Sequence, residues 1–348
     1  MTRFSLRIVL ATTLGWTLAF GQFDNVGTSA ATFLKIGIGP RGEALGGAYS
    51  ASVKDVSSVF WNVAGLANMT QNEIMFTQTN WIADVEHFFV GIGLPMGDFG
   101  TLGASVTYLT MGEMKVTTWE KTEGTGEFFS AYDAVIGLSY ARKLSDRFAI
   151  GVQLKYVTEY ISRSSASAFA IDVGTQYQTG LPGLRLGMSL SNFGTAMRME
   201  GQDMLVKFDP HPDAGSNPDR VPAYLETANW SLPLYFQFGV SYDIFSTETM
   251  RLTSSVDFRD ERDYRSTVFV GGEFAFSDMV FLRGGLRPRT DGKISGKTTS
   301  IEQSYSFAGG VGAKVDIPGT YFKAAFDYSY SDLNRLKAVH RIGVSFLF

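Results

Sequence analysis

From about residue 70 onward, apolar and polar side chains alternate along the chain in short segments. In the segment 148–159, for example, one parity is occupied by Phe148, Ile150, Val152, Leu154 and Tyr156. Successive side chains of a strand point to opposite faces, so this pattern predicts strands with one apolar and one polar face. No stretch beyond residue 70 shows the period of an amphipathic helix.

About fourteen such segments follow one another, and we expect each to be one strand. They are centred near residues 76, 90, 105, 136, 153, 172, 188, 239, 255, 271, 283, 310, 325 and 343. An even number of strands is typical of bacterial outer-membrane barrels, because the strands run up and down and both ends finish on one side.

The connections between these segments alternate in length. Those after even-numbered strands are short, such as MGDFG and KLSDR, whereas those after odd-numbered strands are mostly longer and more polar. Short periplasmic turns and long external loops are what an outer-membrane barrel requires. The sequence therefore predicts an all-β fold, an antiparallel transmembrane β-barrel of about 14 strands over residues 70–348, with external loops at about 112–127, 195–231 and 287–303.

Charged residues of the predicted strands share the polar parity. They are Asp133, Lys155, Glu159, Asp172, Arg185, Arg251, Asp257, Glu273, Arg283, Lys314, Lys323, Asp327 and Arg341. An Arg or Lys on the lipid face at mid-membrane would cost about 2–4 kcal/mol, so the polar parity is expected to face the lumen. We interpret the lumen as polar, and the mixture of both charge signs does not indicate a strongly ion-selective pore.

Composition agrees with a barrel and excludes several other classes. The 348 residues include 38 Gly, 28 Phe and 15 Tyr, a mixture that suits close strands and lipid-facing aromatic side chains. The net charge of -4, from 30 basic and 34 acidic residues, gives no concentrated basic face for nucleic acid. The absence of Cys excludes disulfides, thiolate metal sites and Cys nucleophiles.

The first residues have the pattern of a secretory signal peptide. Arg3 and Arg7 precede an apolar run from Ile8 to Phe20, and Ala19-Phe20-Gly21 offers small residues for cleavage. A transmembrane anchor is the alternative, but the run is short for spanning a bilayer. We expect residues 1–21 to be a signal peptide, which places the protein in the outer membrane of a Gram-negative bacterium, in contact with its lipid.

The chain ends in a segment with Ile342, Val344, Phe346 and Phe348 on one parity. A terminal strand that finishes in an aromatic residue resembles the assembly signal of bacterial outer-membrane proteins. We therefore assign Phe346 and Phe348 to recognition by the barrel assembly machinery. The alternative is an ordinary final strand that happens to end in Phe.

The stretch Gly37-Ile38-Gly39-Pro40-Arg41-Gly42 reads G-x-G-x-x-G, the pattern of a dinucleotide-binding turn. That fingerprint needs a long helix after it and an acidic residue about twenty positions further on. Here Pro40 interrupts the glycines, the position about twenty beyond Gly42 is Asn62, and no βαβ pattern follows. We reject nucleotide binding.

Candidate catalytic residues are few. The three His residues, at 87, 211 and 340, share no metal-ligand spacing, and no G-x-S-x-G motif is present. Asp133 and Asp172 could pair as an acid and a base, but we interpret them as salt-bridged lumen residues. The sequence predicts no enzyme activity, no cofactor and no metal site.

The segment GPRGEALGGAYSASVKDVSSVFWNVAGLA resembles the N-terminal signature of FadL-like outer-membrane proteins, in particular the PorV/PorQ family. The matching positions are Gly42, Gly46, Gly47, Ala48, Asp55, Trp61, Asn62, Ala64, Gly65 and Leu66. The resemblance implies a fourteen-stranded barrel whose residues 22–69 fold inward as a hatch with short helices.

Two residues of this signature carry separate expectations. Asp55 is placed to N-cap a short helix from Ser58 to Trp61. The Pro of the family's Asn-Pro-Ala is replaced by Val63, and its loss is expected to loosen a turn of the hatch.

The predicted loop 195–231 is long, acidic and rich in Pro. Loops of this length are commonly functional or disordered, and both readings stay open. Its apolar residues favour contact with a partner, and the candidate contact residues are Phe208, Tyr224, Leu225 and Trp230.

Two functions follow from the resemblance. The PorV/PorQ likeness implies a non-enzymatic part of type IX-like protein secretion, which binds secreted proteins or the secretion translocon through its external loops. The FadL likeness implies a passive transporter that takes hydrophobic small molecules through the hatch and sideways into the bilayer. The polar lumen favours the secretion function.

Overall fold

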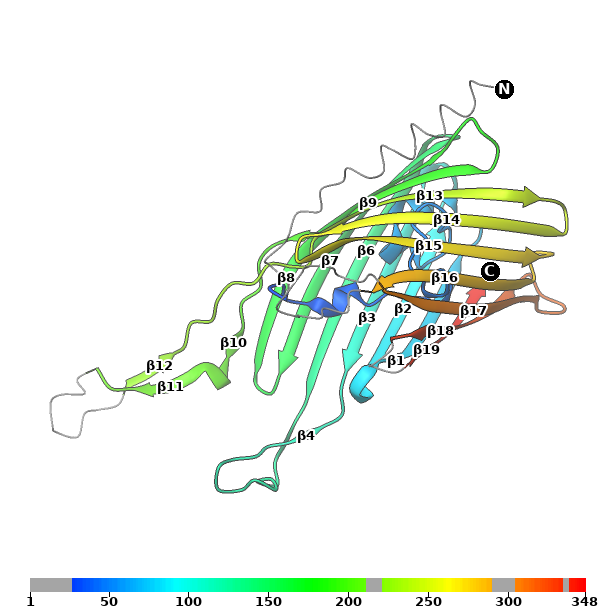
Figure 1. Ribbon diagram of the computed structural model, residues 1–348. Coiled ribbons are helices and arrows are strands. Elements are labelled where there is room, and N and C mark those ends of the chain that lie inside the picture. Colours follow the sequence, from blue (N-terminus) through cyan, green and yellow to red (C-terminus); the bar gives the residue numbers. More distant parts are fainter. Residues whose placement is uncertain (1–26, 211–220, 290–303, 334–337) are drawn as a thin grey trace, which may run out of the picture.

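The computed structural model describes residues 27–210, 221–289, 304–333 and 338–348. The predicted signal peptide lies outside these residues. Fourteen strands form one antiparallel sheet that closes on itself, because the first strand pairs with the last (Figure 1). The strands of the barrel are β1 (Glu73–Asn80), β2 (Glu86–Pro95), β3 (Thr101–Thr110), β6 (Ala131–Ser145), β7 (Phe148–Ile161), β8 (Ser164–Gln178), β9 (Leu184–Gly194), β13 (Tyr235–Ser246), β14 (Met250–Glu261), β15 (Tyr264–Phe276), β16 (Val280–Arg289), β17 (Ser304–Asp316), β18 (Lys323–Asp332) and β19 (Ala338–Leu347). The predicted fold class and strand number are confirmed.

Side chains alternate between the two faces of the wall, as β7 illustrates. Its outward residues Val152 and Leu154 are 39% and 57% exposed, whereas the inward residues Gln153 and Val157 are 2% and 0% exposed. Apolar side chains thus cover the lipid-facing surface, which is the arrangement that a bilayer requires. None of the described helices is long and apolar enough to cross a membrane.

Connections at the two ends of the barrel differ. One end has only short turns, including the 3-10 turn η4 (Gly97–Phe99), and we name it the periplasmic end. The other, external end carries the 3-10 turn η3 (Ile82–Asp84) and two projecting arms (Figure 1). The first arm contains β4 (Met114–Lys115) and β5 (Phe128–Phe129).

The second external arm leaves the barrel after β9 and returns at β13. It contains β10 (Glu200–Gly201), the 3-10 turn η5 (Gln202–Met204), β11 (Leu205–Phe208) and β12 (Val221–Tyr224). β10 pairs with the outer end of β8, and β11 pairs with β12. The third predicted loop, 287–303, is shorter than expected, because β16 continues to Arg289 and β17 begins at Ser304.

Residues 27–72, here called the lumenal segment, run through the inside of the barrel. Near the external end the Ala30 amide donates to the Ser231 carbonyl at 3.0 Å, and near the periplasmic end the Asn72 amide donates to the Phe348 carbonyl at 3.1 Å. Between them lie η1 (Thr32–Lys35), α2 (Pro40–Ala44), α3 (Ser58–Trp61) and η2 (Val63–Asn68). The segment therefore passes the whole height of the wall.

Glycines in the wall let the lumenal segment approach the strands closely. A Cβ added to Gly285 of β16 would lie 2.1 Å from the carbonyl carbon of Leu45. One added to Gly151 of β7 would lie 2.5 Å from that of Val63. Only residues without a side chain fit at these contacts.

The lumen is not polar throughout, which corrects the sequence-based interpretation. On β6, β7 and β8 the inward residues near the external end are small or branched apolar side chains. They are Val135, Val157, Ala166, Ala168 and Ala170, and they form one cluster with Phe33 and Leu34. The alternation of apolar and polar residues wrongly indicates a polar inner face here. An apolar side chain on that face is buried once the lumenal segment covers it, and its burial is favourable.

Candidate functional site

The glycines of the family signature serve the packing of the lumenal segment. Pro40 occupies the first turn of the five-residue helix α2, and Gly42 follows it against Trp61. A Cβ on Gly42 would lie 2.4 Å from the indole ring. Gly46 and Gly47 have φ angles of 67° and 98°, which favour glycine, and they turn the chain beside the wall. This glycine-rich stretch packs inside the barrel rather than opening a long helix.

Trp61 is the largest fully buried side chain of the described residues, at 1% exposure. Its indole nitrogen donates to the Ile38 carbonyl at 2.9 Å. Its ring meets Tyr49 and Phe60 edge-on, with centroid separations of 6.2 and 4.9 Å. Trp61 thus joins the two ends of the signature, with its one polar atom satisfied.

Asn62 ties the turn that follows to both the segment and the wall. Its side-chain amide donates to the Ser50 carbonyl at 2.9 Å and to the Thr175 carbonyl of β8 at 3.0 Å. Its side-chain oxygen accepts from the Ala64 amide at 3.2 Å, which caps η2. Val63 occupies the first position of η2 and is 3% exposed. The turn forms without the family's Pro because Asn62 holds it.

Gly65 lies one turn further along, in η2. A Cβ placed on it would stand 2.6 Å from the Val53 carbonyl oxygen. The signature residues from 61 to 65 therefore gather in one buried layer against the strands.

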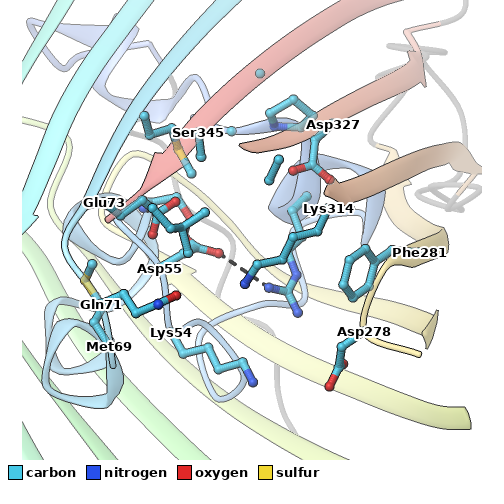
Figure 2. Close-up of a pocket in the computed structure, with 18 of the residues that line it drawn as sticks. Lys54, Asp55, Met69, Gln71, Glu73, Asp278, Phe281, Lys314, Asp327 and Ser345 are labelled. Carbon is cyan, nitrogen blue, oxygen red and sulfur yellow. Dashed lines mark hydrogen bonds and ion pairs between the residues drawn. The ribbon is translucent and has the colours of Figure 1, made fainter. Parts of the chain in front are cut away.

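Asp55 does not cap helix α3, contrary to the prediction. The N-cap residue is Ser57, and its side chain makes no capping bond. Asp55 instead accepts from the Ser57 amide at 2.9 Å and from the Tyr49 hydroxyl at 2.6 Å, and it pairs with Arg41 at 3.5 Å (Figure 2). The carboxylate stabilises the approach to the helix rather than the helix itself, because two residues separate Asp55 from the first helical residue, Ser58, and the N-cap position falls to Ser57.

Three ion-pair groups join the lumenal segment to the wall. Glu43 pairs with Arg341 of β19 and Arg287 of β16, at 3.1 Å each. Burial on its own would raise the pKa of Glu43, but these two guanidiniums hold it below its usual value. Each of the other two groups contains one cation of the segment.

Arg41 bonds Glu273 of β15 through two nitrogens, at 2.8 Å each. Lys35 pairs with Glu261 at 2.9 Å and Asp263 at 2.6 Å, near the external end. The sequence placed Glu273 and Arg341 in the lumen, but these partners were missed, because nothing in the local pattern of residues 35–43 indicates which wall charge each one meets.

The second arm exposes the four predicted contact residues. Phe208, Tyr224, Leu225 and Trp230 are 57%, 70%, 57% and 46% exposed. A feature that the sequence reasoning missed is Trp119 on the first arm, which is fully exposed. Large apolar side chains that water surrounds on a projecting ribbon are typical of interaction surfaces.

At the opposite end, Phe346 and Phe348 lie on the outer face of the wall. Phe348 packs against Phe322 with the ring centroids 6.1 Å apart. β19 pairs with both β18 and β1, so it forms one side of the seam that closes the barrel. Recognition of these two residues during assembly stays a prediction.

Two apolar hollows lie on opposite sides of the wall at β7 and β8. The inner one has a volume of about 40 Å³ and is lined in part by Phe33 of the lumenal segment. The outer one is a lipid-facing groove of about 610 Å³ that includes Leu154 and Phe169. Lys155 lines both hollows, and its ammonium pairs with Asp172 at 2.7 Å.

Within the described ranges, no group of three or more His, Cys, Asp or Glu side chains could hold a metal ion. His87 is buried on the inner face of the wall. His340 is exposed, and its ring forms a hydrogen bond with the Tyr328 hydroxyl. His211 lies outside the described residues. Asp133 faces Glu159 across β6 and β7 and does not approach Asp172, which pairs with Lys155.

Comparison with solved structures shows the same fold in hydrocarbon channels. The CymD monoaromatic hydrocarbon channel is 11% identical, with a TM-score of 0.57 over 90% of this chain and 97% of that one. The toluene transporter TbuX of Ralstonia pickettii is 12% identical, with a TM-score of 0.51 over 89% and 97%. The toluene transporter TodX of Pseudomonas putida is 10% identical, with a TM-score of 0.52 over 89% and 97%. At such identities the likeness shows the fold alone.

No curated protein matches the chain. A family model described as type IX secretion system protein PorV matches residues 21–202, more than half of the 348 residues, and this match confirms the resemblance read from the signature. The chain is therefore an outer-membrane β-barrel that belongs to the PorV family of type IX secretion system proteins.

Proposed function

We propose that this barrel is a non-enzymatic component of type IX-like protein secretion in a Gram-negative bacterium. It binds secreted proteins or the secretion translocon through its external arms, on a wall that stays rigid. The exposed aromatic residues of the second arm carry this proposal, because they project beyond the membrane where only another macromolecule covers them. The family match supports it.

The state of the lumen also supports this function. The lumenal segment runs through the barrel and is joined to the wall by the ion pairs of Lys35, Arg41 and Glu43. A binding function needs no passage through the barrel, and we assign residues 27–69 the role of a hatch that stays shut.

The test is an affinity pull-down of the tagged barrel from native membranes, followed by mass spectrometry. The wild-type protein is expected to recover secreted proteins with C-terminal sorting domains, or a large translocon. Phe208→Ser combined with Tyr224→Ser should remove most of this recovery, because both are exposed aromatic rings of the arm and such rings commonly contribute most of the binding energy.

A matched control is Tyr321→Ser, which changes an aromatic residue that is 97% exposed at the periplasmic end. It should leave recovery unchanged. Equal recovery by the wild type and the arm variant would contradict the proposal.

A second candidate function is passive transport of hydrophobic small molecules, since the proteins of the same fold include a monoaromatic hydrocarbon channel and a toluene transporter. The observation that favours it is the pair of apolar hollows on the two sides of the wall at Lys155. Transport predicts faster uptake of labelled toluene by cells that express the wild-type barrel. Uptake equal to that of cells without the barrel would exclude this function for toluene.

A further inference from the structure

The second external arm ends in a ribbon whose strand edges are unpaired. β11 and β12 form a two-stranded sheet that projects away from the barrel (Figure 1). In the described part of the chain, no third strand pairs with either of them. Each strand therefore leaves one row of backbone donors and acceptors open to its surroundings, which the closed wall does not do.

The hydrogen-bond register of the ribbon shows which groups of β11 point outward. The Leu225 amide donates to the Met204 carbonyl at 2.9 Å, so these two residues form a hydrogen-bonded pair. Leu205 and Lys207 lie one and three positions further along β11. Hydrogen-bonded and non-hydrogen-bonded pairs alternate in an antiparallel ladder, so both residues belong to non-hydrogen-bonded pairs. Their amides and carbonyls point away from β12, to the open edge of β11.

The opposite edge of the ribbon is blocked by Pro222 of β12. Pro222 lies across from Lys207, so its backbone nitrogen points to the outer edge of β12. Proline has no N–H to donate, and its ring occupies the place of an added strand. Such a proline keeps a sheet edge from pairing. β11 contains no Pro, so only its edge is able to take a further strand.

One face of the ribbon is apolar throughout. Its residues are Val206 and Phe208 of β11 and Val221 and Ala223 of β12. Phe208 is 57% exposed and Val221 is 49% exposed, so water reaches this face. A strand added beside β11 would lay every second side chain next to this face.

The chemistry of the β11 edge selects its occupant. Two amides and two carbonyls lie along it at a repeat of about 7 Å, which is twice the rise of one strand residue. An extended polypeptide backbone offers matching groups at the same repeat. Lipid headgroups and metal ions do not.

We propose that β11 is the docking edge of the second arm and that its occupant is an extended segment of a partner polypeptide, which pairs as a third strand. The backbone of this segment bonds the amides and carbonyls of Leu205 and Lys207, and its apolar side chains at alternate positions meet Val206 and Phe208. The inference rests on the function proposed above, because it specifies how the arm holds a secreted protein or the translocon.

The test blocks the edge and leaves the ribbon in place. In Lys207→Pro the outward amide is lost, and the ring obstructs β11 as Pro222 obstructs β12. The ladder within the ribbon is kept, because the Lys207 amide takes no part in it and the preceding Val206 already has an extended backbone. In the pull-down from native membranes, this variant should recover secreted proteins with C-terminal sorting domains, or the translocon, about ten-fold less than the wild type.

Two substitutions serve as matched controls. Lys207→Gln removes the charge and keeps the amide, and Pro222→Ala changes the opposite edge of the ribbon. Both variants should recover at least as much protein as the wild type. Heat-modifiable migration on a gel confirms that the barrel of each variant is folded.

Hydrogen exchange resolved to single amides gives a second measurement that needs no substitution. In the purified barrel, the amides of Val206 and Phe208 should exchange more slowly than those of Leu205 and Lys207, because only the first two are bonded within the ribbon. In the recovered complex, the exchange of the Leu205 and Lys207 amides should slow by about ten-fold or more. Unchanged exchange at Val206 in Lys207→Pro shows that the ribbon itself is kept.

Several outcomes would overturn the docking edge and leave the proposed function standing. They are equal recovery by Lys207→Pro and the wild type, an equal loss in Lys207→Gln, and outward amides that stay unprotected in the complex. Recovery through the arm of only a second copy of the barrel would overturn the occupant. If the wild-type barrel recovers neither secreted proteins nor a translocon, the proposed function and this inference both fail.

Discussion

Glu43 and Arg341 face each other across the boundary between the lumenal segment and β19, and both side chains are only 1% exposed. A buried ion pair of this kind adds little net stability compared with apolar residues of the same size. Loss of one partner is different, because it leaves the other charge buried and uncompensated. The pair therefore specifies where the segment lies more than it stabilises the barrel.

Replacement of Glu43 by Gln should lower the free energy of unfolding by about 3–5 kcal/mol, since Arg341 and Arg287 would lose their common anion. Urea unfolding in detergent, followed by migration on a gel, measures the change. Asp203→Asn is the control, because Asp203 pairs with Arg163 on the surface, and we expect no measurable change there. Equal stability of the Glu43→Gln variant and the wild type would contradict the role of the pair.

The same pair predicts a pH dependence. The pKa of Glu43 is lowered in the folded state, so its ion pairs contribute fully above the unfolded pKa of about 4.3 and weaken as the pH falls through the folded value. The difference in unfolding free energy between the wild type and Glu43→Gln should be constant above about pH 6 and shrink below about pH 4. If the difference in unfolding free energy between the two proteins disappeared above about pH 6, the pKa of Glu43 would be raised by folding rather than lowered.

Gly285 and Gly284 of β16 offer a matched pair of substitutions. A Cβ on Gly285 would meet the Leu45 backbone at 2.1 Å, whereas one on Gly284 would be 3.9 Å from the nearest atom, in Phe307. Gly285→Ala should destabilise the folded barrel by about 1–3 kcal/mol, and Gly284→Ala should have little effect. The measurement is the temperature at which the compact band disappears on a gel, and identical temperatures for the two variants would show that the segment does not press on the wall.

At the scale of elements, the lumenal segment and the arms depend on the wall to different degrees. Helices α2 and α3 have five and four residues, too few to be stable alone, so the wall must hold them in place. The second arm pairs mainly within itself, through β11 and β12, and touches the barrel through β10 at the outer end of β8.

Replacement of residues 202–227 by a short Gly-Ser turn should therefore leave the thermal stability of the barrel unchanged. The pairing of β9 with β13 begins at Ser191 and Tyr235, outside the replaced residues, so the replacement removes none of the hydrogen bonds between these strands. Heat-modifiable migration of the shortened protein tests this expectation. A large loss of stability would show that the arm is part of the folding unit rather than an appended surface.

For the elements, the sequence was informative where one face of a strand meets lipid. All fourteen barrel strands could be predicted, because a charged side chain on the outer face is costly and every second residue of a strand is therefore uncharged. The hatch helices depended on the family resemblance, since segments of four or five residues leave no periodic signal. The cap assigned to Asp55 was wrong although the helix spans Ser58–Trp61 as expected, because the N-cap residue directly precedes the helix and is Ser57.

At the scale of the whole molecule, the lumenal segment determines whether the barrel is a pore. Planar-bilayer recordings should show no steady ion conductance for the wild type, because residues 27–72 obstruct the lumen. Deletion of residues 27–68 should produce a large conductance, since fourteen strands enclose a wide interior. Migration on a gel must first show that the deletion variant is folded, and a folded but non-conducting variant would contradict the hatch role.

The candidate site was less predictable than the barrel at this scale. The residues of the signature and the lumen-facing charges could be identified from the sequence, but the pairing of Arg41 with Glu273 joins positions 232 residues apart.

The course of the lumenal segment also has a consequence for biogenesis. The described chain begins beside Ser231 at the external end, whereas Phe348 lies at the periplasmic end next to Asn72. Once β1 and β19 have paired, the closed barrel surrounds the lumenal segment, which passes through it from the periplasmic end to the external end. Entry of this segment into a barrel that has already closed would require threading through the ring, so we expect the segment to be in place before β1 and β19 pair.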